Sequence, residues 1–317
     1  MYNIIPRKGE FTMKVNEIYQ DYLDYLKLKN KVTTINHTQL KIKNYVLPYF
    51  GEMDIYNITE KDYIDFQLKI KELNYSESFN EQIHTITKKF FDYISLIYKI
   101  DNIAERVGKI INTKKNQSKI IHNVWSKKEF KRFINKVDDP IYHAMFNFLF
   151  YTGARKSEAM ALKVSDLQND SIVISKSITK DWYEGKRLII STKSGKSRRI
   201  KIDRLLKHEL NQLIKYYIKK YDNYNSDFFL FGGNKPISPT SLERKKNHYC
   251  DLAKVKRIRI HDFRHSHATM LYNKNVKIKI IQERLGHADI STTMDTYVHL
   301  DENEQKRLIH KINLIRL

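Results

Sequence analysis

Residues that break helices are scarce in this chain, which has nine Gly and five Pro among its 317 residues. Apolar residues recur every three or four positions over long stretches, the spacing that gives a helix one apolar face. The exception is residues 171–202, where β-branched residues surround a Ser-Gly turn, as is typical of a small antiparallel sheet. The predicted fold class is therefore mainly α with a small antiparallel β-sheet (α+β).

Four helices are predicted in the first third of the sequence. Apolar periodicity marks three of them, over residues 15–28, 33–47 and 79–98, and the second is expected to end before the next proline. Thr59 and Asp62 have the spacing of a capping box and predict the start of the remaining helix. Together these segments predict a small helical bundle.

A basic, polar segment without an amphipathic face interrupts this pattern at residues 108–123 and predicts a linker. Ser126 and Glu129 then have the spacing of a second capping box, and the nearly continuous apolar run 141–151 predicts a buried helix. The predicted organisation is an N-terminal extension (1–12), a helical domain (13–107), the linker (108–123) and a second domain (124–317).

The charge balance constrains the partners of the chain. Lys and Arg number 58 against 36 Asp and Glu, a net charge of +22 that favours a polyanion such as DNA, RNA or an anionic membrane. The absence of a long basic amphipathic helix makes the membrane the weakest of these. The single cysteine, Cys250, excludes an internal disulfide and a Cys-cluster zinc site. With no apolar leader and no run of about 18 apolar residues, we expect a cytoplasmic protein without membrane spans.

Four short islands in the second domain carry reactive or charged residues. The first follows the buried helix, the second lies at the expected tip of a β-hairpin, the third opens a helix after a basic run, and the fourth precedes a tyrosine. In order, they are TGARKSE (152–158), STKSGKSRR (191–199), HDFRH (261–265), and LGH (285–287) followed by Tyr297.

Each island also has a structural interpretation when it is taken alone. Arg155 could pair with Glu158 on a helix surface, and Lys193 could lie in a solvated turn. Gly286 could end a helix, and Tyr297 is one of 21 tyrosines. The three neighbouring histidines could be packed, exposed or metal-binding, although no carboxylate or thiol accompanies them at ligand spacing. These are His261, His265 and His267.

Taken together, the order and spacing of the islands resemble the tyrosine recombinase (phage integrase) family. That family has an Arg in TGxRxSE, a Lys on a β-hairpin, an HxxR pair, an LGH histidine and then a nucleophilic Tyr. The ten-residue interval from His287 to Tyr297 is one longer than in many members and is similar to integrases of Gram-positive mobile elements. The first-domain sequence LPYFGEMDIYNITEKDYIDF resembles the SAM-like core-binding domain of these enzymes. The resemblance implies that the catalytic residues are Arg155, Lys193, His261, Arg264, His287 and Tyr297, with Glu158 as a supporting residue.

The resemblance also implies a role for each catalytic residue. Tyr297 would attack DNA phosphorus to form a 3′-phosphotyrosyl link and free a 5′-hydroxyl. Arg155 and Arg264 would clamp the non-bridging oxygens, and Lys193 would protonate the leaving oxygen. The two histidines would hydrogen-bond the phosphate or move protons at the tyrosine. Because the arginines supply positive charge, neither a metal, a cofactor nor ATP is expected.

Double-stranded DNA recombination sites are the expected partners. By resemblance, a C-terminal helix within residues 303–317 would dock on a neighbouring protomer and build a tetramer on DNA, in a bacterial cytoplasm and close to the nucleoid. A directionality factor and a host DNA-bending protein are further expected partners. Basic residues of the linker, the hairpin and the run before island three are the predicted DNA contacts. They are Lys114, Lys115, Lys119, Lys196, Arg198, Arg199, Arg257 and Arg259.

Several alternatives to an integrase of a phage, genomic island or transposon stay open. An Xer-like chromosome-dimer resolvase fits the length, since only about a dozen residues precede the first helix, where integrases commonly carry an arm-binding domain. A type IB topoisomerase would use a similar residue set to relax DNA. A noncatalytic DNA-binding regulator and a metal-dependent nuclease built on the three histidines are more distant alternatives.

Overall fold

The computed structural model describes residues 12–109, 123–183, 186–191 and 197–286. The chain divides into two compact units, residues 1–118 and 119–317, and this division falls inside the predicted linker. The finer domain boundaries proposed from the sequence stay predictions. Within the described ranges, none of the helices has the length and apolar character needed to cross a membrane.

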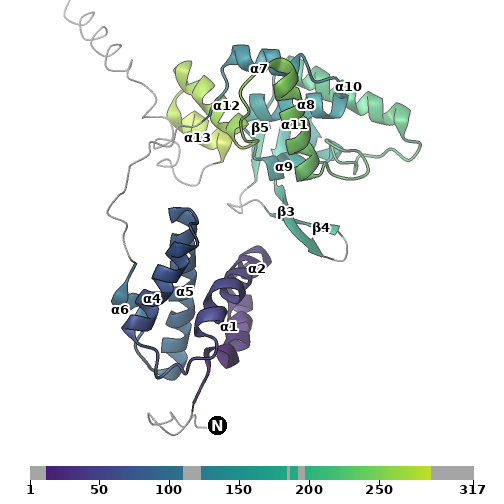
Figure 1. Ribbon diagram of the computed structural model, residues 1–317. Coiled ribbons are helices and arrows are strands. Elements are labelled where there is room, and N and C mark those ends of the chain that lie inside the picture. Colours follow the sequence, from purple (N-terminus) through teal and green to yellow (C-terminus); the bar gives the residue numbers. More distant parts are fainter. Residues whose placement is uncertain (1–11, 110–122, 184–185, 192–196, 287–317) are drawn as a thin grey trace, which may run out of the picture. The chain divides into compact units, whose positions relative to one another are not determined.

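Unit 1 is a helical bundle in which α1 and α2 pair beside α5, while α4 and α6 pack together on α5 (Figure 1). The predicted helices at 15–28 and 79–98 and the helix after Thr59 are confirmed. The elements are α1 (Val15–Lys29), α2 (Val32–Lys41), a π-helical turn η1 (Ile42–Val46), α3 (Leu47–Phe50), α4 (Glu60–Glu72), α5 (Glu77–Tyr98) and α6 (Ile103–Val107).

The predicted end of the second helix before Pro48 is wrong, because helical backbone continues from α2 through η1 into α3. Pro48 lies in the first turn of α3, directly after the π turn, and has no N–H to donate to the preceding turn of the helix. The helix therefore changes its winding at the π turn and accommodates a proline that would have broken a regular α-helix.

Aromatic side chains fill the core of unit 1. The rings of Tyr22, Phe50 and Phe66 are buried together, and the Phe50 and Phe66 centroids lie 4.9 Å apart. The predicted capping box is present at the start of α4, where the Thr59 N–H donates to Asp62 Oδ2 at 2.8 Å. Local capping and a shared aromatic core thus specify this bundle.

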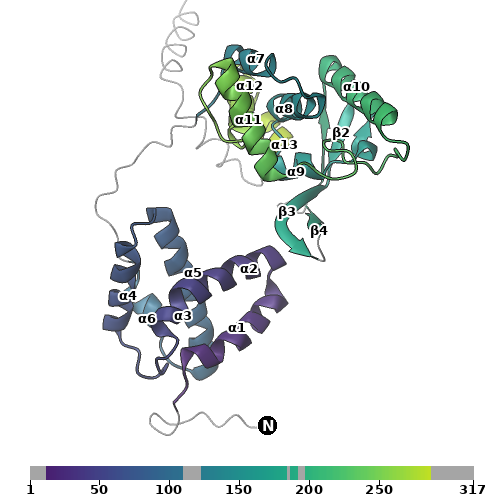
Figure 2. The same cartoon turned by 45° about the vertical axis from the view of Figure 1, so that its right-hand side comes forward.

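Unit 2 is built around the apolar helix α8, which contacts α7, α9, α10 and α12 (Figure 2). Its elements are α7 (Lys127–Ile134), α8 (Pro140–Thr152), α9 (Lys156–Ala161), η2 (Val164–Asp166), β1 (Leu167–Gln168), β2 (Ser171–Ile174), β3 (Lys176–Tyr183), β4 (Lys186–Ser191), β5 (Arg198–Lys201), α10 (Arg204–Lys220), α11 (Pro239–Ala253), α12 (Asp262–Asn273) and α13 (Ile278–Leu285).

The β region is antiparallel, as predicted, but it forms two sheets. Strands β1, β2 and β5 make one sheet, and β3 pairs with β4 in a separate ladder that extends from the unit beside α9 (Figure 1). The segment that contains Lys193 therefore connects strands of different sheets, β4 and β5. Lys193 itself lies outside the described residues, so its predicted place at the tip of a hairpin stays a prediction, although the two strands that flank it pair with β3 and β2 and not with each other.

Trp125 fixes the start of the described part of unit 2. Its backbone N–H donates to Ser266 Oγ at 2.9 Å and its indole Nε1 donates to the carbonyl oxygen of Lys256 at 2.9 Å. The ring packs on Phe133 and Phe263. Immediately afterwards the Ser126–Glu129 capping box starts α7, which confirms that prediction.

Candidate active site of unit 2

The first island lies at a sharp turn between α8 and α9, and Gly153 makes the turn. Gly153 has φ +68°, and a Cβ there would lie 2.7 Å from atoms of His267 and Leu285. The turn thus needs glycine both for its left-handed backbone and for the close approach of α12 and α13. The Thr152 hydroxyl supports it by accepting from the Ala154 N–H at 3.2 Å.

Arg155 is the N-cap of α9 and makes two different contacts. Its Nη1 donates to Glu158 Oε1 at 2.9 Å, and its Nη2 donates to the Gly286 carbonyl oxygen at 3.2 Å. The pairing of Arg155 with Glu158 that the spacing predicts is therefore present, but the carboxylate is buried. The Arg155 side chain keeps 23% of its surface exposed, so it can still meet a ligand.

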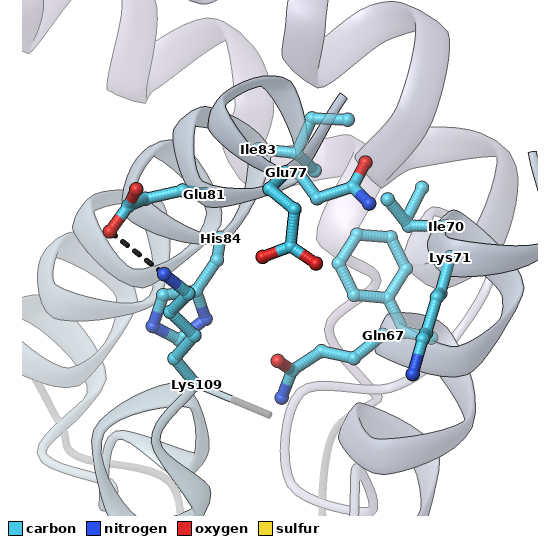
Figure 3. A pocket seen from close by; sticks show the side chains of 10 residues that line it. Gln67, Ile70, Lys71, Glu77, Glu81, Ile83, His84 and Lys109 are labelled. Carbon is cyan, nitrogen blue, oxygen red and sulfur yellow. Dashed lines mark hydrogen bonds and ion pairs between the residues drawn. The ribbon is translucent and has the colours of Figure 1, made fainter. Parts of the chain in front are cut away.

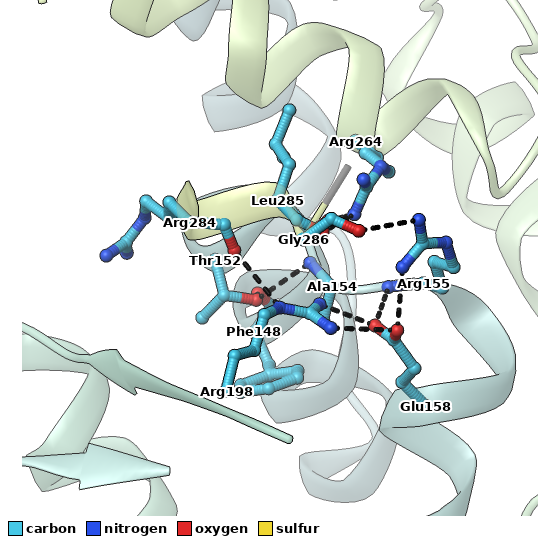
Figure 4. Close-up of polar contacts among 11 residues, drawn as sticks. Phe148, Thr152, Ala154, Arg155, Glu158, Arg198, Arg264, Arg284, Leu285 and Gly286 are labelled. Carbon is cyan, nitrogen blue, oxygen red and sulfur yellow. Dashed lines mark hydrogen bonds and ion pairs between the residues drawn. The ribbon is translucent and has the colours of Figure 1, made fainter. Parts of the chain in front are cut away.

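Arg264 joins the same place from α12, where it is only 2% exposed. Its Nη1 donates to the carbonyl oxygens of Gly153 at 2.9 Å and of Leu285 at 2.8 Å. Islands one, three and four, which are far apart in the sequence, thus meet at the Gly153 and Leu285–Gly286 turns (Figure 4). The islands were expected to meet only because their order resembles the motifs of the tyrosine recombinase family. The local sequence of each island does not predict this convergence.

A cavity of about 580 Å³ lies beside this meeting point and is open to solvent. Arg155, Lys156, Arg259 and His261 line it together with Glu243, so cations outnumber anions among these side chains. Desolvation by the surrounding protein and the charge of Arg264 lower the pKa of His261, although its side chain reaches solvent, and this favours its neutral form. The ring of His265 lies 4.9 Å from that of His261. The cavity suits an anionic group.

Glu158 and Arg198 form a buried ion pair beneath Arg155. Arg198 Nη1 donates to Glu158 Oε1 at 2.9 Å and Nη2 to Oε2 at 2.6 Å, and Figure 4 shows both arginines directed at this carboxylate. Burial alone would raise the pKa of Glu158, but Arg198 and Arg155 outweigh it and lower this pKa to about 2. Glu158 is therefore an anion at any pH at which the protein would work.

Arg284 of α13 fastens the end of that helix to its surroundings. It donates from Nε to His267 Nε2 at 3.1 Å, from Nη1 to the Lys201 carbonyl oxygen at 3.1 Å, and from Nη2 to that of Tyr151 at 3.0 Å. Burial, with the nearby charge of Arg284, lowers the pKa of His267 to about 3. The neutral imidazole can therefore accept the hydrogen bond from Arg284.

The predicted DNA-contacting arginines occupy different environments. Arg198 donates from Nη1 and Nη2 to Glu158 and from Nε to the Arg284 carbonyl oxygen, an arrangement that does not fit the predicted contact with DNA. Arg199 donates to Gln168 at 2.9 Å. Arg257 pairs with Asp251, and Arg259 with the buried Asp262, while both arginine side chains stay more than half exposed. Arg199, Arg257 and Arg259 stay predicted DNA contacts.

Several predicted site residues lie outside the described residues. They are Lys193, His287 and Tyr297 of the predicted catalytic set, and Lys114, Lys115, Lys119 and Lys196 of the predicted DNA contacts. Sequence reasoning named Arg198 as a DNA contact and overlooked its contact with Glu158. The signal for Arg198 was weak, because one of two adjacent arginines in a basic run gives no sign of facing a buried carboxylate.

The histidine-based metal site predicted as an alternative gains no support from this geometry. Among the described residues, no three His, Cys, Asp or Glu side chains are grouped in a way that could hold a metal ion. His267 is buried against Arg284, whereas His261 lines the open cavity.

Unit 1 has a small cavity of about 60 Å³ between α4 and α5 (Figure 3). Lys109 pairs with Glu81 at 2.8 Å across it, and the Gly108 carbonyl oxygen accepts from Gln67 Nε2 at 2.9 Å. His84 Nδ1 lies 2.7 Å from the Tyr63 hydroxyl, and burial lowers the pKa of His84. The contacts of Lys109 and Gly108 hold the end of α6 on the bundle, the contact of His84 with Tyr63 joins α5 to α4, and none of the four islands contributes to them.

Comparisons with known proteins agree with the geometry. The phage integrase family matches residues 123–304, and the N-terminal SAM-like domain of phage integrases matches residues 14–71. The ICEBs1 integrase of Bacillus subtilis is 27% identical over 305 residues, spanning 92% of this chain and 80% of that protein. Tyrosine recombinase XerA of Pyrococcus furiosus is 27% identical over 306 residues, spanning 95% of both.

A solved structure shares the fold of the whole chain. The Tn1549 transposon integrase, in complex with transposon right end DNA, superimposes with a TM-score of 0.75 at 18% identity and covers 95% of this chain and 100% of that one. At this identity the likeness concerns the fold alone. The family match spans most of unit 2 and includes all four islands. The chain therefore belongs to the phage integrase family of tyrosine recombinases, enzymes that transfer DNA strands.

Proposed function

We propose that this protein is a site-specific recombinase of a mobile genetic element, which cuts and rejoins double-stranded DNA through a 3′-phosphotyrosyl intermediate on Tyr297. The observation that carries the proposal is the convergence of Arg155 and Arg264 on the Gly153 and Leu285–Gly286 turns, beside a cavity rich in cations. The Tn1549 integrase structure contains DNA, and the net charge of +22 suits the same partner.

The arginines would neutralise the phosphate during the reaction. A phosphodiester resists attack because its non-bridging oxygens are negative, and this charge grows in the transition state. Arg155 and Arg264 stay charged throughout and can make charge-assisted hydrogen bonds to these oxygens. The hydrogen bonds to the carbonyl oxygens of Gly153, Leu285 and Gly286 hold the guanidinium groups in place before the substrate arrives.

The proposed cleavage step transfers a DNA phosphoryl group from O5′ to the oxygen of Tyr297. The Tyr297 oxygen attacks phosphorus, the bond from phosphorus to O5′ breaks, and Lys193 gives its proton to the leaving O5′. The phenolic proton passes to a histidine of the site, and the lowered pKa of His261 leaves its imidazole neutral and able to accept that proton. The covalent link retains the bond energy, so a 5′-hydroxyl of a second strand can reseal the DNA without ATP or a metal ion.

Covalent trapping tests this proposal. The protein is incubated in EDTA with labelled, nicked duplexes from the DNA that flanks its own gene, and denaturing gels show any adduct. We expect the wild type to form an adduct and Tyr297→Phe to bind the same fragment without forming one. An adduct that persists in Tyr297→Phe would assign the nucleophile elsewhere, and one that forms only when divalent metal is added would contradict the mechanism.

An Xer-like chromosome-dimer resolvase is the second candidate function. The observation that favours it is the similarity to XerA of Pyrococcus furiosus, which is 27% identical over 95% of this chain. Recombination assays on two plasmid substrates separate the candidates. Activity on the ends of the element that carries the gene supports an integrase, and activity only on a chromosomal resolution site supports the resolvase. DNA relaxation without strand exchange would instead indicate topoisomerase activity.

A further inference from the structure

We propose that Arg198 is a positioning residue of the active site, which holds Glu158 and through it Arg155, and which ties both to the turn before His287. The proposal rests on the proposed catalytic role of Arg155. It replaces the predicted contact between Arg198 and DNA with a function inside the protein, because Nε, Nη1 and Nη2 of Arg198 all donate to protein oxygens and the side chain is directed at Glu158 (Figure 4).

Both oxygens of the Glu158 carboxylate are shared by the two arginines. Oε1 accepts from Arg155 Nη1 and from Arg198 Nη1, each at 2.9 Å. Oε2 accepts from the Arg155 backbone N–H at 2.9 Å and from Arg198 Nη2 at 2.6 Å. The carboxylate is 1% exposed, so Arg198 supplies half of the hydrogen bonds that hold it.

Arg198 also contacts the end of α13. Its Nε donates to the Arg284 carbonyl oxygen at 3.2 Å. Its side chain packs so closely on Gly286 that a Cβ there would lie 3.0 Å from the Arg198 side chain. Since the Gly286 carbonyl oxygen accepts from Arg155, the contacts close a ring that runs from Arg155 through Glu158 and Arg198 to the turn and back to Arg155.

The position of Arg198 in the sequence makes this ring relevant to catalysis. Arg198 is the first residue of β5, where it pairs with Ile174 of β2, and it follows Lys193 by five residues. Gly286, which packs against Arg198 and accepts a hydrogen bond from Arg155, directly precedes His287 in the sequence. One side chain therefore links the strand after the predicted general acid to the turn before a predicted catalytic histidine.

The charges around Glu158 give this role a pH signature. Among the described residues, the cations that face the carboxylate are Arg155 from the start of α9 and Arg198 from β5, while α13 presents carbonyl oxygens. Arg264 of α12 is bonded to the neighbouring turns. Without Arg198, burial opposes a single arginine, so the pKa of Glu158 should rise and the carboxylate should take up a proton as the pH falls.

The test compares Arg198→Met, Arg198→Lys and Arg284→Met with the wild type, on a nicked duplex that the wild type cleaves. Adduct formation is followed from about pH 5 to pH 8, and DNA affinity by gel shift. We expect Arg198→Met to bind DNA normally but to cleave it about 10- to 100-fold more slowly, and the deficit to grow as the pH falls. Arg198→Lys should recover part of the rate, because lysine restores the positive charge but cannot make the two parallel hydrogen bonds that the guanidinium group makes to Glu158.

Arg284→Met is the matched control, because Arg284 also joins β5 to α13 but contacts the Lys201 carbonyl oxygen and not Glu158. It should lower thermal stability without altering the shape of the pH profile. In a Glu158→Gln background, Arg198→Met should add no further pH dependence. Full cleavage by Arg198→Met, or a loss of DNA affinity as large as its loss of rate, would overturn the positioning role. Failure of the wild type to form any adduct would instead count against the proposed function.

Discussion

At the scale of single residues, backbone carbonyl oxygens organise the arginines of this site. Arg155 and Arg264 donate to the carbonyl oxygens of Gly153, Leu285 and Gly286, which come from two distant turns. Side chains held in this way before the substrate binds need little reorganisation during the reaction, which is how electrostatic catalysis gains its strength. In the proposed mechanism, residues of the turns would thus contribute to catalysis through their backbone.

Replacing either arginine should separate binding from cleavage. We expect Arg155→Ala to keep most DNA affinity, since the chain has 58 Lys and Arg residues that can neutralise phosphates, but to lose about 10²- to 10³-fold in cleavage rate. Arg264→Lys should show a similar deficit, because lysine keeps the charge but not the paired donors. Gel shifts and single-turnover adduct formation measure the two effects. Cleavage at a near-normal rate by either variant would contradict the proposed clamp.

His267 should make the stability of unit 2 sensitive to acid. Its pKa is about 3 in the folded protein and about 6.5 when exposed, so the unfolded state binds a proton first as the pH falls. Its contribution to stability is therefore complete above about pH 6.5 and is lost progressively toward pH 3. Urea unfolding at a series of pH values measures this loss. His267→Gln should be less stable at neutral pH and should show a flatter profile, and an unchanged profile would refute the assignment.

At the scale of elements, the sequence predicted the helices and caps that depend on neighbouring residues. It did not predict the strand pairing, which depends on residues far apart in the sequence. Both capping boxes and the helices α1, α4 and α5 follow from side chains within a few positions of one another. The strands form two sheets because β5 pairs with β2 and not with β4, which is its neighbour in sequence. This pairing depends on contacts between residues that are far apart in the sequence. The same limit hid Arg198, whose partner Glu158 is 40 residues away.

The turn between α8 and α9 should be the most sensitive junction between helices near the site. Gly153→Ala would place a methyl group 2.7 Å from His267 and Leu285 in a left-handed backbone, and we expect it to destabilise the protein by about 2 kcal/mol or more. Lys254→Gly is the matched control for the backbone alone, because Lys254 is exposed and already holds a left-handed backbone with φ +52° and ψ +47°, so this variant gives the cost of a side chain in that backbone without crowding. Denaturant unfolding of both variants measures the two effects, and a cost of Gly153→Ala no larger than the stability gained by Lys254→Gly would show that crowding contributes little.

At the scale of the whole molecule, the family and the two-unit organisation were within reach of the sequence, whereas the DNA contacts were not. Ordered motifs identify a family even when each motif alone has a structural explanation. Contact with DNA depends on which cationic side chains are free to reach it. A basic run in the sequence can contain both cations that are engaged inside the protein and cations that are exposed to solvent. Arg198 is buried on Glu158, whereas Arg257 and Arg259 point their side chains to solvent.

Assembly on DNA provides a prediction at this scale. If the C-terminal segment docks on a neighbouring protomer, removal of residues 303–317 should leave binding to a single site nearly unchanged and weaken the joining of two sites strongly. Gel shifts with one-site and two-site duplexes, supported by sedimentation, measure both properties. Loss of single-site binding to the same degree would show that the segment supports its own protomer, and unchanged pairing of sites would refute docking in trans.

The anchoring of Trp125 has a mechanical consequence. Its backbone and its indole ring are both bonded inside unit 2, and the backbone bond goes to Ser266, two residues after Arg264 on α12. Tension on the chain before Trp125 would therefore reach α12, the helix that carries Arg264, together with the segment at Lys256 that precedes this helix. Force applied to the chain before Trp125 would thus be transmitted to the part of unit 2 that is proposed to hold the phosphate.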